Sequence, residues 1–356
     1  MSLALSMGLR GMGQTWPNPS VGCVVVIDNQ IIGRGTTADG GRPHAEVVAL
    51  AQAGAKAFGA TAYVTLEPCA HTGKSPPCTE VLIKSGIARV VAAVCDHDPR
   101  VNGKGFSALK AAGIDVVTGV MADRAAHDHS GFFLSISQDR PFLTLKMATS
   151  FDGRIATASG QSKWITDAAA RRLVHLMRSR HNAVMVGGGT ARLDDPSLNV
   201  RNLGIARQPV RVVVSRHLDL PDDSIFARTA RQNPLWICHS QEAKTSQIQK
   251  WQKIGAKPII CDVKNDLIDL KDLMARLVSL GLTRVFCEGG GALAASLIKS
   301  DLVDELIGFG AGVLMGSEGK SSIGDLGLDD LASAKRWALQ DMQKVGPDIF
   351  HKWSRK

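Results

Sequence analysis

Four residues near the start of the chain have the types and spacing of a catalytic metal centre. His44 and Glu46 stand two positions apart in the segment PHAE, Cys69 ends the segment EPC, and Cys78 follows after eight residues. One imidazole and two thiolates suit zinc, and three protein ligands leave a fourth position for water. Zinc lowers the pKa of such a water to about 7. The pattern therefore predicts zinc ligands at His44, Cys69 and Cys78, with Glu46 moving protons.

The order of these segments along the chain indicates which kind of zinc chemistry the site performs. A His-x-Glu pair alone is usually a helix surface, and a buried cysteine is more often a small core residue than a ligand. Taken together and in this order, the segments match the signature of zinc-dependent deaminases, although those usually place about two residues between the cysteines. The longer loop here adds His71 and Lys74 beside the metal, where they could meet an anionic substrate. A solvated loop is the alternative for both residues.

Short β-branched runs and amphipathic segments predict the elements that hold these residues. Within residues 1–140 the predicted strands are Val21–Ile27, Ala62–Leu66, Val90–Val94 and Ile114–Val117, with Asp28-Asn29 as a hairpin turn into Ile31-Ile32. The predicted helices are His44–Ala53, Cys78–Ser85, Gly105–Ala112 and Ala122–Ser137. This alternation indicates a sheet covered by helices on both faces.

A polar turn that ends in Pro141 marks the expected domain boundary. With 356 residues the chain exceeds a typical single domain, and we expect domains at residues 1–140 and 141–356. The predicted strands of the second domain are Phe142–Met147, Ala183–Val186, Val210–Val214, Pro234–Cys238, Pro258–Cys261, Arg284–Cys287 and Glu305–Phe309. The predicted helices are Asp167–Arg180, Leu270–Leu280 and Ala292–Lys299. The second domain is therefore also expected to be α/β.

Two glycine-rich turns in the second domain could hold phosphates. One is Glu288–Gly291 and the other is Gly187–Thr190, each directly after a predicted strand. Backbone amides at such turns can approach a phosphate, and two turns suggest a dinucleotide, although a tight connection explains either turn alone. Neither turn is a GxGxxG fingerprint. Ser215-Arg216 after the strand Val210–Val214 favours the 2′-phosphate of NADPH over NADH.

The predicted helix Asp167–Arg180 has two distinct faces. Leu173, Leu176 and Met177 form its expected core stripe, while Arg171, His175 and Arg178 share another face. A solvated basic face is the usual explanation. Arg201 offers a further cation, however, and two arginines could clamp a ribose phosphate.

The amino-acid composition indicates which class of molecule the protein binds. The net charge is +9, but aromatic residues make up only 5% and no run of Lys and Arg exceeds two. Proteins that bind single-stranded nucleic acid interleave aromatic platforms with basic residues, so phosphorylated small molecules fit better. The seven cysteines are scattered and odd in number, which favours a reducing compartment over a disulfide framework. No run of eighteen apolar residues occurs. We therefore expect a cytoplasmic protein without nucleic-acid or membrane partners.

Longer segments of the first domain resemble a known family. PNPSVGCVVV, PHAEVVAL, AYVTLEPCAHTGKSPPCTEVLIKSGIARVV and DHDPRVNGKG are similar to the bifunctional riboflavin-biosynthesis family, in which a pyrimidine deaminase is fused to a reductase. The resemblance implies a cytidine-deaminase-like three-layer αβα fold, with Asn18, His71 and Lys74 contacting the substrate. The family usually reads Asp-Pro-Asn-Pro where this chain has Asp96-His97-Asp98-Pro99.

The resemblance continues through the second domain. LKMATSFDGRIATASGQSKWIT, MVGGGTARLDDPSLNVR, CEGGGALAASLI and LVDELI are similar to the reductase half, which is related to dihydrofolate reductase. The NADPH contacts that it implies are Lys146, Ala148, Trp164, Thr190, Asp194, Ser215, Gly290 and Gly291. The implied substrate contacts are Ser162, Arg178, Leu198, Arg201 and Glu288. Phe151 and Asn199 replace the family's frequent Leu and Thr.

The sequence thus predicts an enzyme with two activities that needs zinc and NADPH. Zinc-dependent deamination of a phosphorylated diaminopyrimidine precedes reduction of its ribosyl group to ribityl, and a homo-oligomer (dimer or tetramer) is expected. One alternative is a nucleic-acid-editing deaminase with a C-terminal binding module. Another is a reductase that carries an inert metal domain.

Overall fold

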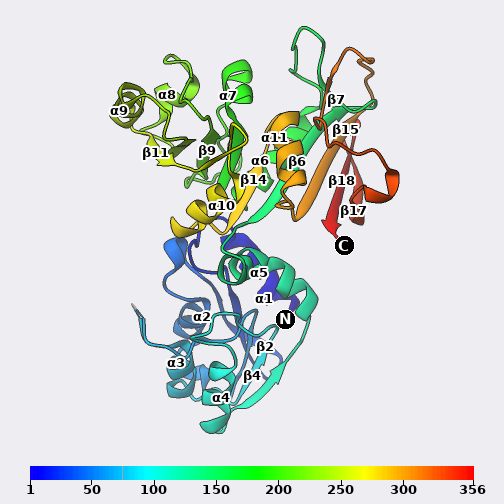
Figure 1. Cartoon of the computed structure of the whole chain (residues 1–356). Helices are drawn as coiled ribbons and strands as arrows, with labels where there is room; N and C mark the ends of the chain where they lie inside the picture. Colours follow the sequence, from blue (N-terminus) through cyan, green and yellow to red (C-terminus); the bar gives the residue numbers. More distant parts are fainter. Residues whose placement is uncertain (74) are drawn as a thin grey trace. The chain divides into compact units, whose positions relative to one another are not determined.

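The chain divides into two compact units, Met1–Arg140 and Pro141–Lys356. Figure 1 shows the computed structural model, which describes residues 1–73 and 75–356. Each unit has its own sheet and is described by itself. No helix within the described residues is long and apolar enough to cross a bilayer.

The first unit is built on a five-stranded mixed sheet in the order β2-β1-β3-β4-β5. The strands are β1 (Gly22–Ile27), β2 (Gln30–Thr36), β3 (Thr61–Val64), β4 (Arg89–Ala92) and β5 (Asp115–Thr118). β1 pairs antiparallel with β2 and β3, while β3, β4 and β5 are parallel. The predicted hairpin turn is confirmed, because Asp28 and Asn29 both have positive φ (48° and 60°), as the tight turn between two strands requires.

Helices cover both faces of this sheet. They are α1 (Ser2–Gly11), α2 (Ala45–Ala53), α3 (Cys78–Lys84), α4 (Lys104–Ala111) and α5 (Ala122–Ser137), with short 3₁₀ turns at Asp39–Gly41 and Gly54–Ala57. Ala49 of α2, Leu82 of α3 and Leu109 of α4 belong to the main core cluster. Leu5 of α1 and Ala125 of α5 form a separate small cluster with Ala93. The three-layer αβα fold predicted for this domain is confirmed.

Helix α1 is the one α-helix among the described residues of this unit that the sequence does not predict. Its glycines make the local helix signal weak. The helix forms because it packs very closely on β1: a Cβ added at Gly22 would lie 1.9 Å from the carbonyl oxygen of Ala4. Tertiary contact, rather than helix propensity, therefore decides this element.

The second unit has a nine-stranded sheet in the order β11-β10-β9-β8-β14-β6-β15-β18-β17. These strands are β6 (Phe142–Ser150), β8 (Ala183–Gly187), β9 (Val210–Val214), β10 (Leu235–His239), β11 (Lys257–Ile260), β14 (Arg284–Cys287), β15 (Glu305–Ala311), β17 (Trp337–Val345) and β18 (Asp348–Arg355). All neighbours are parallel except the last two pairs, where β18 runs antiparallel to β15 and to β17. Minor strands are β7 (Arg154–Ala156), β12 (Val263–Lys264), β13 (Leu267–Ile268) and β16 (Lys320–Ser321).

The helices of the second unit lie mostly in the connections between parallel strands. They are α6 (Ala168–Ser179), α7 (Gly188–Asp194), α8 (Ile225–Thr229), α9 (Thr245–Ile254), α10 (Leu270–Ser279) and α11 (Gly291–Lys299), with a 3₁₀ turn at Leu331–Ser333. Every strand and helix predicted for this half is present, so its α/β class is confirmed. The hairpin β17–β18 and the helices α7, α8 and α9 are additions that the sequence analysis does not contain.

The buried face of α6 differs from the prediction. Ala170, Val174 and Ser179 are the buried residues, Leu173 and Met177 pack against the core only in part, and Leu176 is outside that cluster. The expected stripe is therefore displaced toward smaller side chains. The physical reason is that Arg178 turns toward the interior, where it pairs with a buried carboxylate.

His181, just after α6, is a buried imidazole of the second unit. Its Nδ1 lies 2.7 Å from the carbonyl oxygen of Met177, and its Nε2 lies 3.1 Å from Oγ1 of Thr144. Burial, with the positive charge of Arg284, lowers the pKa of His181 to about 4. The folded protein therefore keeps this ring neutral where an unfolded chain would protonate it.

We expect His181 to make the second unit less stable in mild acid. Between about pH 6.5 and 4 the unfolded state binds a proton at this ring that the folded state does not. The contribution of His181 to the free energy of unfolding is therefore complete above about pH 6.5, and about 2–3 kcal/mol is lost as the pH falls to about 4. Denaturant unfolding from pH 7.5 to 4, followed by fluorescence of the buried Trp251, measures the loss. His181→Gln should flatten the pH dependence, whereas His217→Gln, at an exposed ring, should not. Equal slopes for His181→Gln and wild type would contradict this assignment.

Candidate active sites

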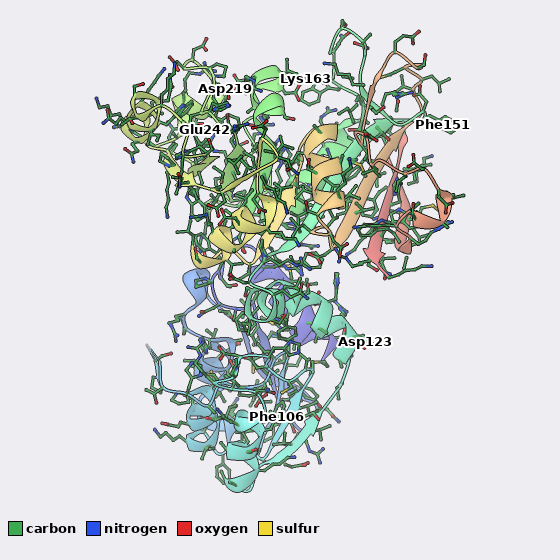
Figure 2. All side chains as sticks on the ribbon, in the orientation of Figure 1. Phe106, Asp123, Phe151, Lys163, Asp219 and Glu242 are labelled. Carbon is green, nitrogen blue, oxygen red and sulfur yellow. The ribbon has the colours of Figure 1, made fainter. Side chains whose placement is uncertain are left out.

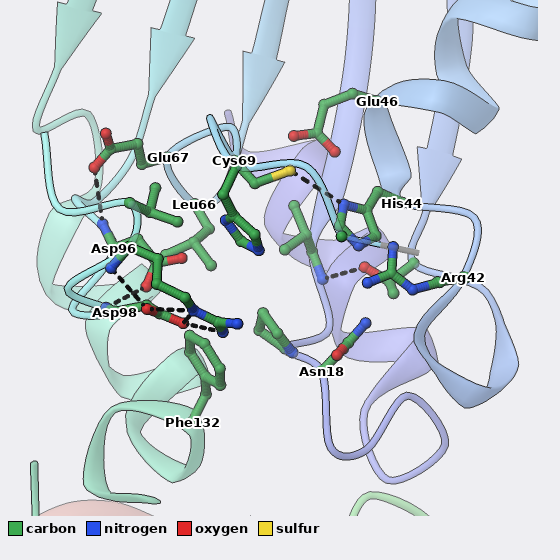
Figure 3. A pocket seen from close by; sticks show the side chains of 17 residues that line it. Asn18, Arg42, His44, Glu46, Leu66, Glu67, Cys69, Asp96, Asp98 and Phe132 are labelled. Atoms are coloured by element: carbon green, nitrogen blue, oxygen red, sulfur yellow. Dashed lines mark hydrogen bonds and ion pairs between the residues drawn. The ribbon is translucent and has the colours of Figure 1, made fainter. Parts of the chain in front are cut away.

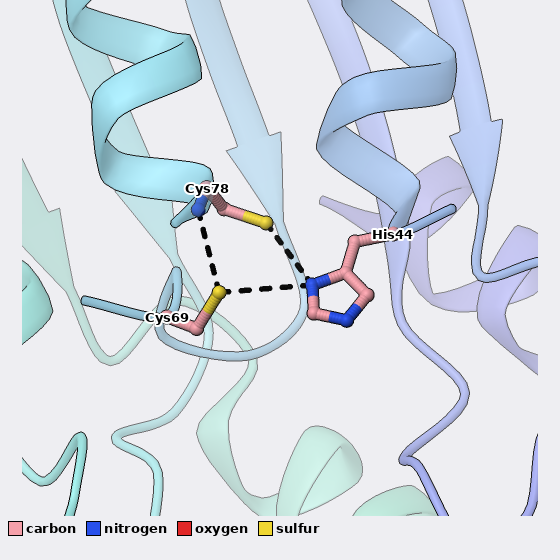
Figure 4. A group of neighbouring side chains, drawn as sticks. All are labelled: His44, Cys69 and Cys78. Atoms are coloured by element: carbon pink, nitrogen blue, oxygen red, sulfur yellow. Dashed lines mark hydrogen bonds between the residues drawn. The ribbon is translucent and has the colours of Figure 1, made fainter. Parts of the chain in front are cut away.

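The structure brings His44, Cys69 and Cys78 together in the first unit (Figure 4). Nδ1 of His44 lies 3.2 Å from Sγ of Cys78 and 3.7 Å from Sγ of Cys69. All three ligand atoms lie within 4.8 Å of one another. This is the only group of three or more possible metal ligands found among the described residues.

Each of these residues sits where a strand ends or a helix begins. His44 immediately precedes α2, Cys78 is the first residue of α3, and Cys69 lies in the segment that follows β3. The backbone amide of Cys78 donates to Sγ of Cys69 (3.3 Å). Hydrogen bonds from Cys78 and His44 outweigh the effect of burial and lower the pKa of Cys69 to about 4. Cys69 is thus prepared to act as a thiolate.

The donor set fits zinc. Zn–S and Zn–N bonds of about 2.3 and 2.0 Å place tetrahedral ligand atoms roughly 3.5 Å apart, close to the two separations measured from Nδ1 of His44. One neutral imidazole and two sulfurs are also a preferred set for this metal. Three protein ligands leave room for one more, as in catalytic sites.

Glu46 lies on the first turn of α2 and lines the cavity beside the ligands (Figure 3). Its side chain is buried, with the residue only 3% exposed. Burial raises the pKa of Glu46 to about 7. A carboxyl group of this kind can hold or release a proton near neutral pH.

The cavity at this centre has a volume of about 330 Å³. Of the residues predicted to contact substrate, Asn18 and His71 line it, while Lys74 lies outside the described residues. Asn18 is held by a hydrogen bond from its Nδ2 to the carbonyl oxygen of Gly41 (2.9 Å). The side-chain amide is thereby fixed at the cavity wall.

Further residues of the wall were not proposed as site residues from the sequence. Arg42 and Arg100 bring positive charge, and Glu67, Asp96 and Asp98 bring carboxyl groups. Asp98 accepts two hydrogen bonds from Nε of Arg100 (2.9 and 3.0 Å), and this contact with Arg100 holds the pKa of Asp98 below its ordinary value. Burial raises the pKa of Asp96 to about 6. The departure of segment 96–99 from the family pattern was the available signal for Asp98.

A larger cavity, of about 770 Å³, lies in the second unit. It is bordered by β6, α6, α7 and the segment after β14. The predicted cofactor and substrate residues that line it are Lys146, Ala148, Ser162, Trp164, Arg178, Thr190, Asp194, Leu198, Arg201, Glu288 and Gly290. The structure thus gathers residues that are as far apart as 144 positions in the chain.

Glu288 is the buried centre of this second cavity. Arg178 donates to both carboxylate oxygens, from Nε (2.6 Å) and Nη2 (3.1 Å), and Nζ of Lys146 lies 3.9 Å away. Burial alone would raise the pKa of Glu288, but the charges of Arg178 and Lys146 hold it below its ordinary value. Burial in turn lowers the pKa of Lys146. A solvated basic face is therefore the wrong description of Arg178.

The two glycine turns meet at one end of the cavity. α7 begins at Gly188 and α11 at Gly291, and the amide of Gly290 donates to Oγ1 of Thr190 (3.1 Å). An adjoining cavity of about 740 Å³ is lined by Gly187, Gly189, Gly290 and Gly291. Both predicted turns thus face a shared space that suits an extended ligand.

Ser215 lines neither of these cavities. Its hydroxyl donates to Oδ1 of Asp219 (2.7 Å), and Arg216 pairs with Glu242. Asp219 and Glu242, the acidic partners of Ser215 and Arg216, are both labelled in Figure 2. Arg216 also lies 3.3 Å from Asp266. Its charge is therefore already balanced within the protein, which weakens the argument from Ser215-Arg216 for a 2′-phosphate.

Two family models match separate parts of the chain. Residues 1–94 match the family model of the cytidine and deoxycytidylate deaminase zinc-binding region, and residues 141–351 match the RibD C-terminal domain. Riboflavin biosynthesis protein RibD of Aquifex aeolicus is 40% identical, covering 98% of this chain and 96% of that protein. RibD of Escherichia coli is also 40% identical, with the same coverages of 98% and 96%.

Solved structures give the same result. A structure of Acinetobacter baumannii RibD superposes with a TM-score of 0.88 at 37% identity, covering 100% of this chain and 97% of that one. The diaminohydroxyphosphoribosylaminopyrimidine deaminase/5-amino-6-(5-phosphoribosylamino)uracil reductase of Thermotoga maritima gives 0.88 at 31% identity, again covering 100% and 97%. The chain therefore belongs to the RibD family of riboflavin biosynthesis, as a bifunctional enzyme that combines a zinc-binding deaminase domain with a reductase domain.

Proposed function

We propose that this chain performs two successive steps on one phosphorylated pyrimidine. Residues 1–140 hydrolytically deaminate 2,5-diamino-6-ribosylamino-4(3H)-pyrimidinone 5′-phosphate, and residues 141–356 use NADPH to reduce the ribosyl group of the product to ribityl. The observation that carries the proposal is the cluster of His44, Cys69 and Cys78 beside the buried Glu46. The Thermotoga maritima relative, whose name contains the same two reactions, supports it.

In the deaminase unit the protein's own groups position the pyrimidine and move protons. His44, Cys69 and Cys78 would hold zinc, and the bound metal would supply a Lewis acid that makes a water molecule acidic near neutral pH. Glu46 takes the proton of that water and gives it to the departing amine, so that a C–O bond replaces the C–N bond at the ring carbon and ammonia leaves. Asn18, His71 and Lys74 contact the substrate. Arg42 brings to the cavity wall a positive charge that suits a phosphate ester, whereas the charge of Arg100 is matched by Asp98.

In the reductase unit Glu288 and its partners fix the substrate. The ribosyl ring opens to an imine, NADPH supplies the hydride that adds to C1′, and the ring oxygen gains a proton. Ser162, Arg178, Leu198, Arg201 and Glu288 contact the substrate. Lys146, Ala148, Trp164, Thr190, Asp194, Ser215, Gly290 and Gly291 contact NADPH. Except for Ser215, these residues line the two adjoining cavities, which supports this assignment.

The proposal also covers the location of the protein, its oligomeric state and its partners. We also propose that the protein acts in the reducing cytoplasm, where disulfides are rare. Leu339, Met342 and Ile349 are exposed on the β17–β18 hairpin, which suits contact with a second copy in a dimer or tetramer. The partners are small molecules. The family match over nearly the whole chain does not favour a nucleic-acid-editing deaminase.

Glu46→Gln should separate the two activities. The amide cannot take up the water's proton, so ammonia release should fall by about 10²–10⁴-fold. Reduction of the deaminated substrate, followed by NADPH absorbance, should be unchanged, and so should the zinc content. Glu80→Gln, on the exposed side of α3, is the matched control. Deamination within a few-fold of wild type would show that Glu46 is not the proton shuttle.

Removing zinc should stop only the first reaction. Chelation of the purified protein should abolish ammonia release and leave NADPH oxidation with the deaminated substrate intact, since the three ligands all lie in the first unit. Added zinc should restore ammonia release. Cys78→Ser should bind less than one zinc per chain by elemental analysis. Full ammonia release from metal-free protein would refute the metal assignment.

Arg201→Ala should weaken substrate binding in the reductase. Arg201 is exposed at the rim of the second cavity, where it can pair with a phosphate. Losing a charge-assisted contact should raise the KM for the deaminated substrate by about tenfold and change kcat less. Arg180→Ala, at an exposed arginine after α6, is the control for general charge effects. An unchanged KM would remove Arg201 from the proposed phosphate contacts.

A further inference from the structure

Glu67 opens the EPC segment that carries Cys69, and its side chain accepts five hydrogen bonds from one stretch of chain, of which Figure 3 shows the one from Asp96. Oε2 accepts from Sγ of Cys95 (2.9 Å), the amide of Asp96 (3.2 Å) and the amide of Gly103 (2.9 Å). Oε1 accepts from the amides of Gly105 (2.9 Å) and Phe106 (3.2 Å). Glu67 is only 3% exposed, so water does not replace these donors.

The stretch held in this way, residues 95–106, forms one wall of the deaminase cavity. Asp96, Asp98, Arg100 and Val101 of this loop line the cavity. Glu67 itself stands two positions before the ligand Cys69. One carboxylate therefore joins the metal-binding segment to the wall that faces the metal.

Two further contacts hold residues 95–106 in place. A Cβ added at Gly105 would lie 2.1 Å from the carbonyl oxygen of Pro68 and 3.0 Å from Oε1 of Glu67. On the other side of the loop, the ring of His97 stacks on Phe133 of α5, with ring centroids 3.8 Å apart and planes 19° apart. The stretch is thus held at both ends by Glu67 and, at His97, also by α5.

Only a carboxylate satisfies all five donors. Both of its oxygens accept, whereas a glutamine side chain of the same shape would turn an N–H₂ group toward two or three N–H or S–H donors. Two of the donors, Gly105 and Phe106, lie in the first turn of α4, where negative charge is favourable. Burial and the hydrogen bond to Glu67 raise the pKa of Cys95 to about 11, so the thiol keeps its hydrogen and donates.

We propose that Glu67 is a positioning residue of the deamination: it holds loop 95–106 against the Cys69 segment, so that Asp96, Asp98 and Arg100 meet the pyrimidine at a fixed place relative to the metal ligands. This inference rests on the proposed deaminase function of residues 1–140. Glu67 lines the cavity wall, but both of its carboxylate oxygens accept hydrogen bonds from residues 95–106, so it acts through the loop.

Glu67→Gln tests this role through the balance between binding and turnover. With the loop released, the KM of deamination should rise by about tenfold or more, while kcat falls by no more than about threefold. Zinc content and NADPH-dependent reduction should stay at wild-type levels. Hydrogen–deuterium exchange should speed up at residues 95–106 and stay unchanged at α2. Glu80→Gln is the isosteric control on the exposed side of α3 and should match wild type in every measurement.

Two more variants separate positioning from simple loss of stability. Gly105→Ala leaves Glu67 intact but pushes the loop off Pro68, so it should reproduce the rise in KM. Leu82→Ala removes a fully buried side chain of the same unit; it should lower the unfolding midpoint without changing KM. If Glu67→Gln fails to fold, the comparison of Gly105→Ala with Leu82→Ala decides the question.

The outcomes distinguish this inference from the proposed function. If wild type releases no ammonia from the diaminopyrimidine, the proposed function fails, and the exchange of residues 95–106 in Glu67→Gln still shows whether Glu67 holds the loop. A Glu67→Gln variant with wild-type KM and wild-type exchange would overturn the inference. It would also be overturned if zinc content and kcat fell together at constant KM, because Glu67 would then act only on the Cys69 side.

Discussion

A carboxylate that is removed from water must find donors or positive charges inside the protein, because an unpaired buried charge is very costly. The deaminase cavity and the larger cavity of the second unit each contain one such group. In the first unit Glu67 is satisfied almost entirely by backbone amides and a thiol. In the second unit Glu288 is satisfied by the charged side chains of Arg178 and Lys146.

The two solutions have different consequences. Backbone amides fix the course of the chain, so Glu67 determines the shape of a loop. The partners of Glu288 are cationic side chains rather than backbone amides. The cluster therefore fixes the side chains of Glu288, Arg178 and Lys146 relative to one another and keeps positive charge in the cavity. Arg178 can do so because α6 turns it inward, at the expense of the larger apolar stripe that the helix could otherwise bury.

Parallel strands explain where both sites lie. Glu67 and Cys69 follow β3, and loop 95–106 follows β4. Gly187 ends β8 and α7 begins directly after it, and Glu288 follows β14. The carboxyl ends of parallel strands meet along one edge of a sheet, and the helices that follow begin there, with their unpaired amides facing the same space. The antiparallel hairpins at the sheet margins, β1–β2 and β17–β18, contribute less to the cavities.

Local signals made much of this predictable. β-branched runs such as Val210–Val214 mark buried parallel strands regardless of their neighbours, and Asp28-Asn29 marks a turn by its own backbone preference. The metal ligands could be predicted because each stands in a short segment with recognisable chemistry. Helix α1 could not, because its stability comes from the close approach to Gly22, and β17 could not, because its largely exposed residues lack the alternation of a half-buried strand.

The sequence by itself determined the family, the two α/β units and the chemistry of the residues His44, Glu46, Cys69 and Cys78. Only the tertiary structure decided what Glu67, Arg178 and Arg100 do. An isolated Glu or Arg in a sequence is a charged side chain with no stated partner, and its partners here stand between 2 and 110 positions away. For Glu67 and for Arg178 with Glu288, burial turns these pairings into requirements, because a charge without water must be matched by the groups that the fold brings to it.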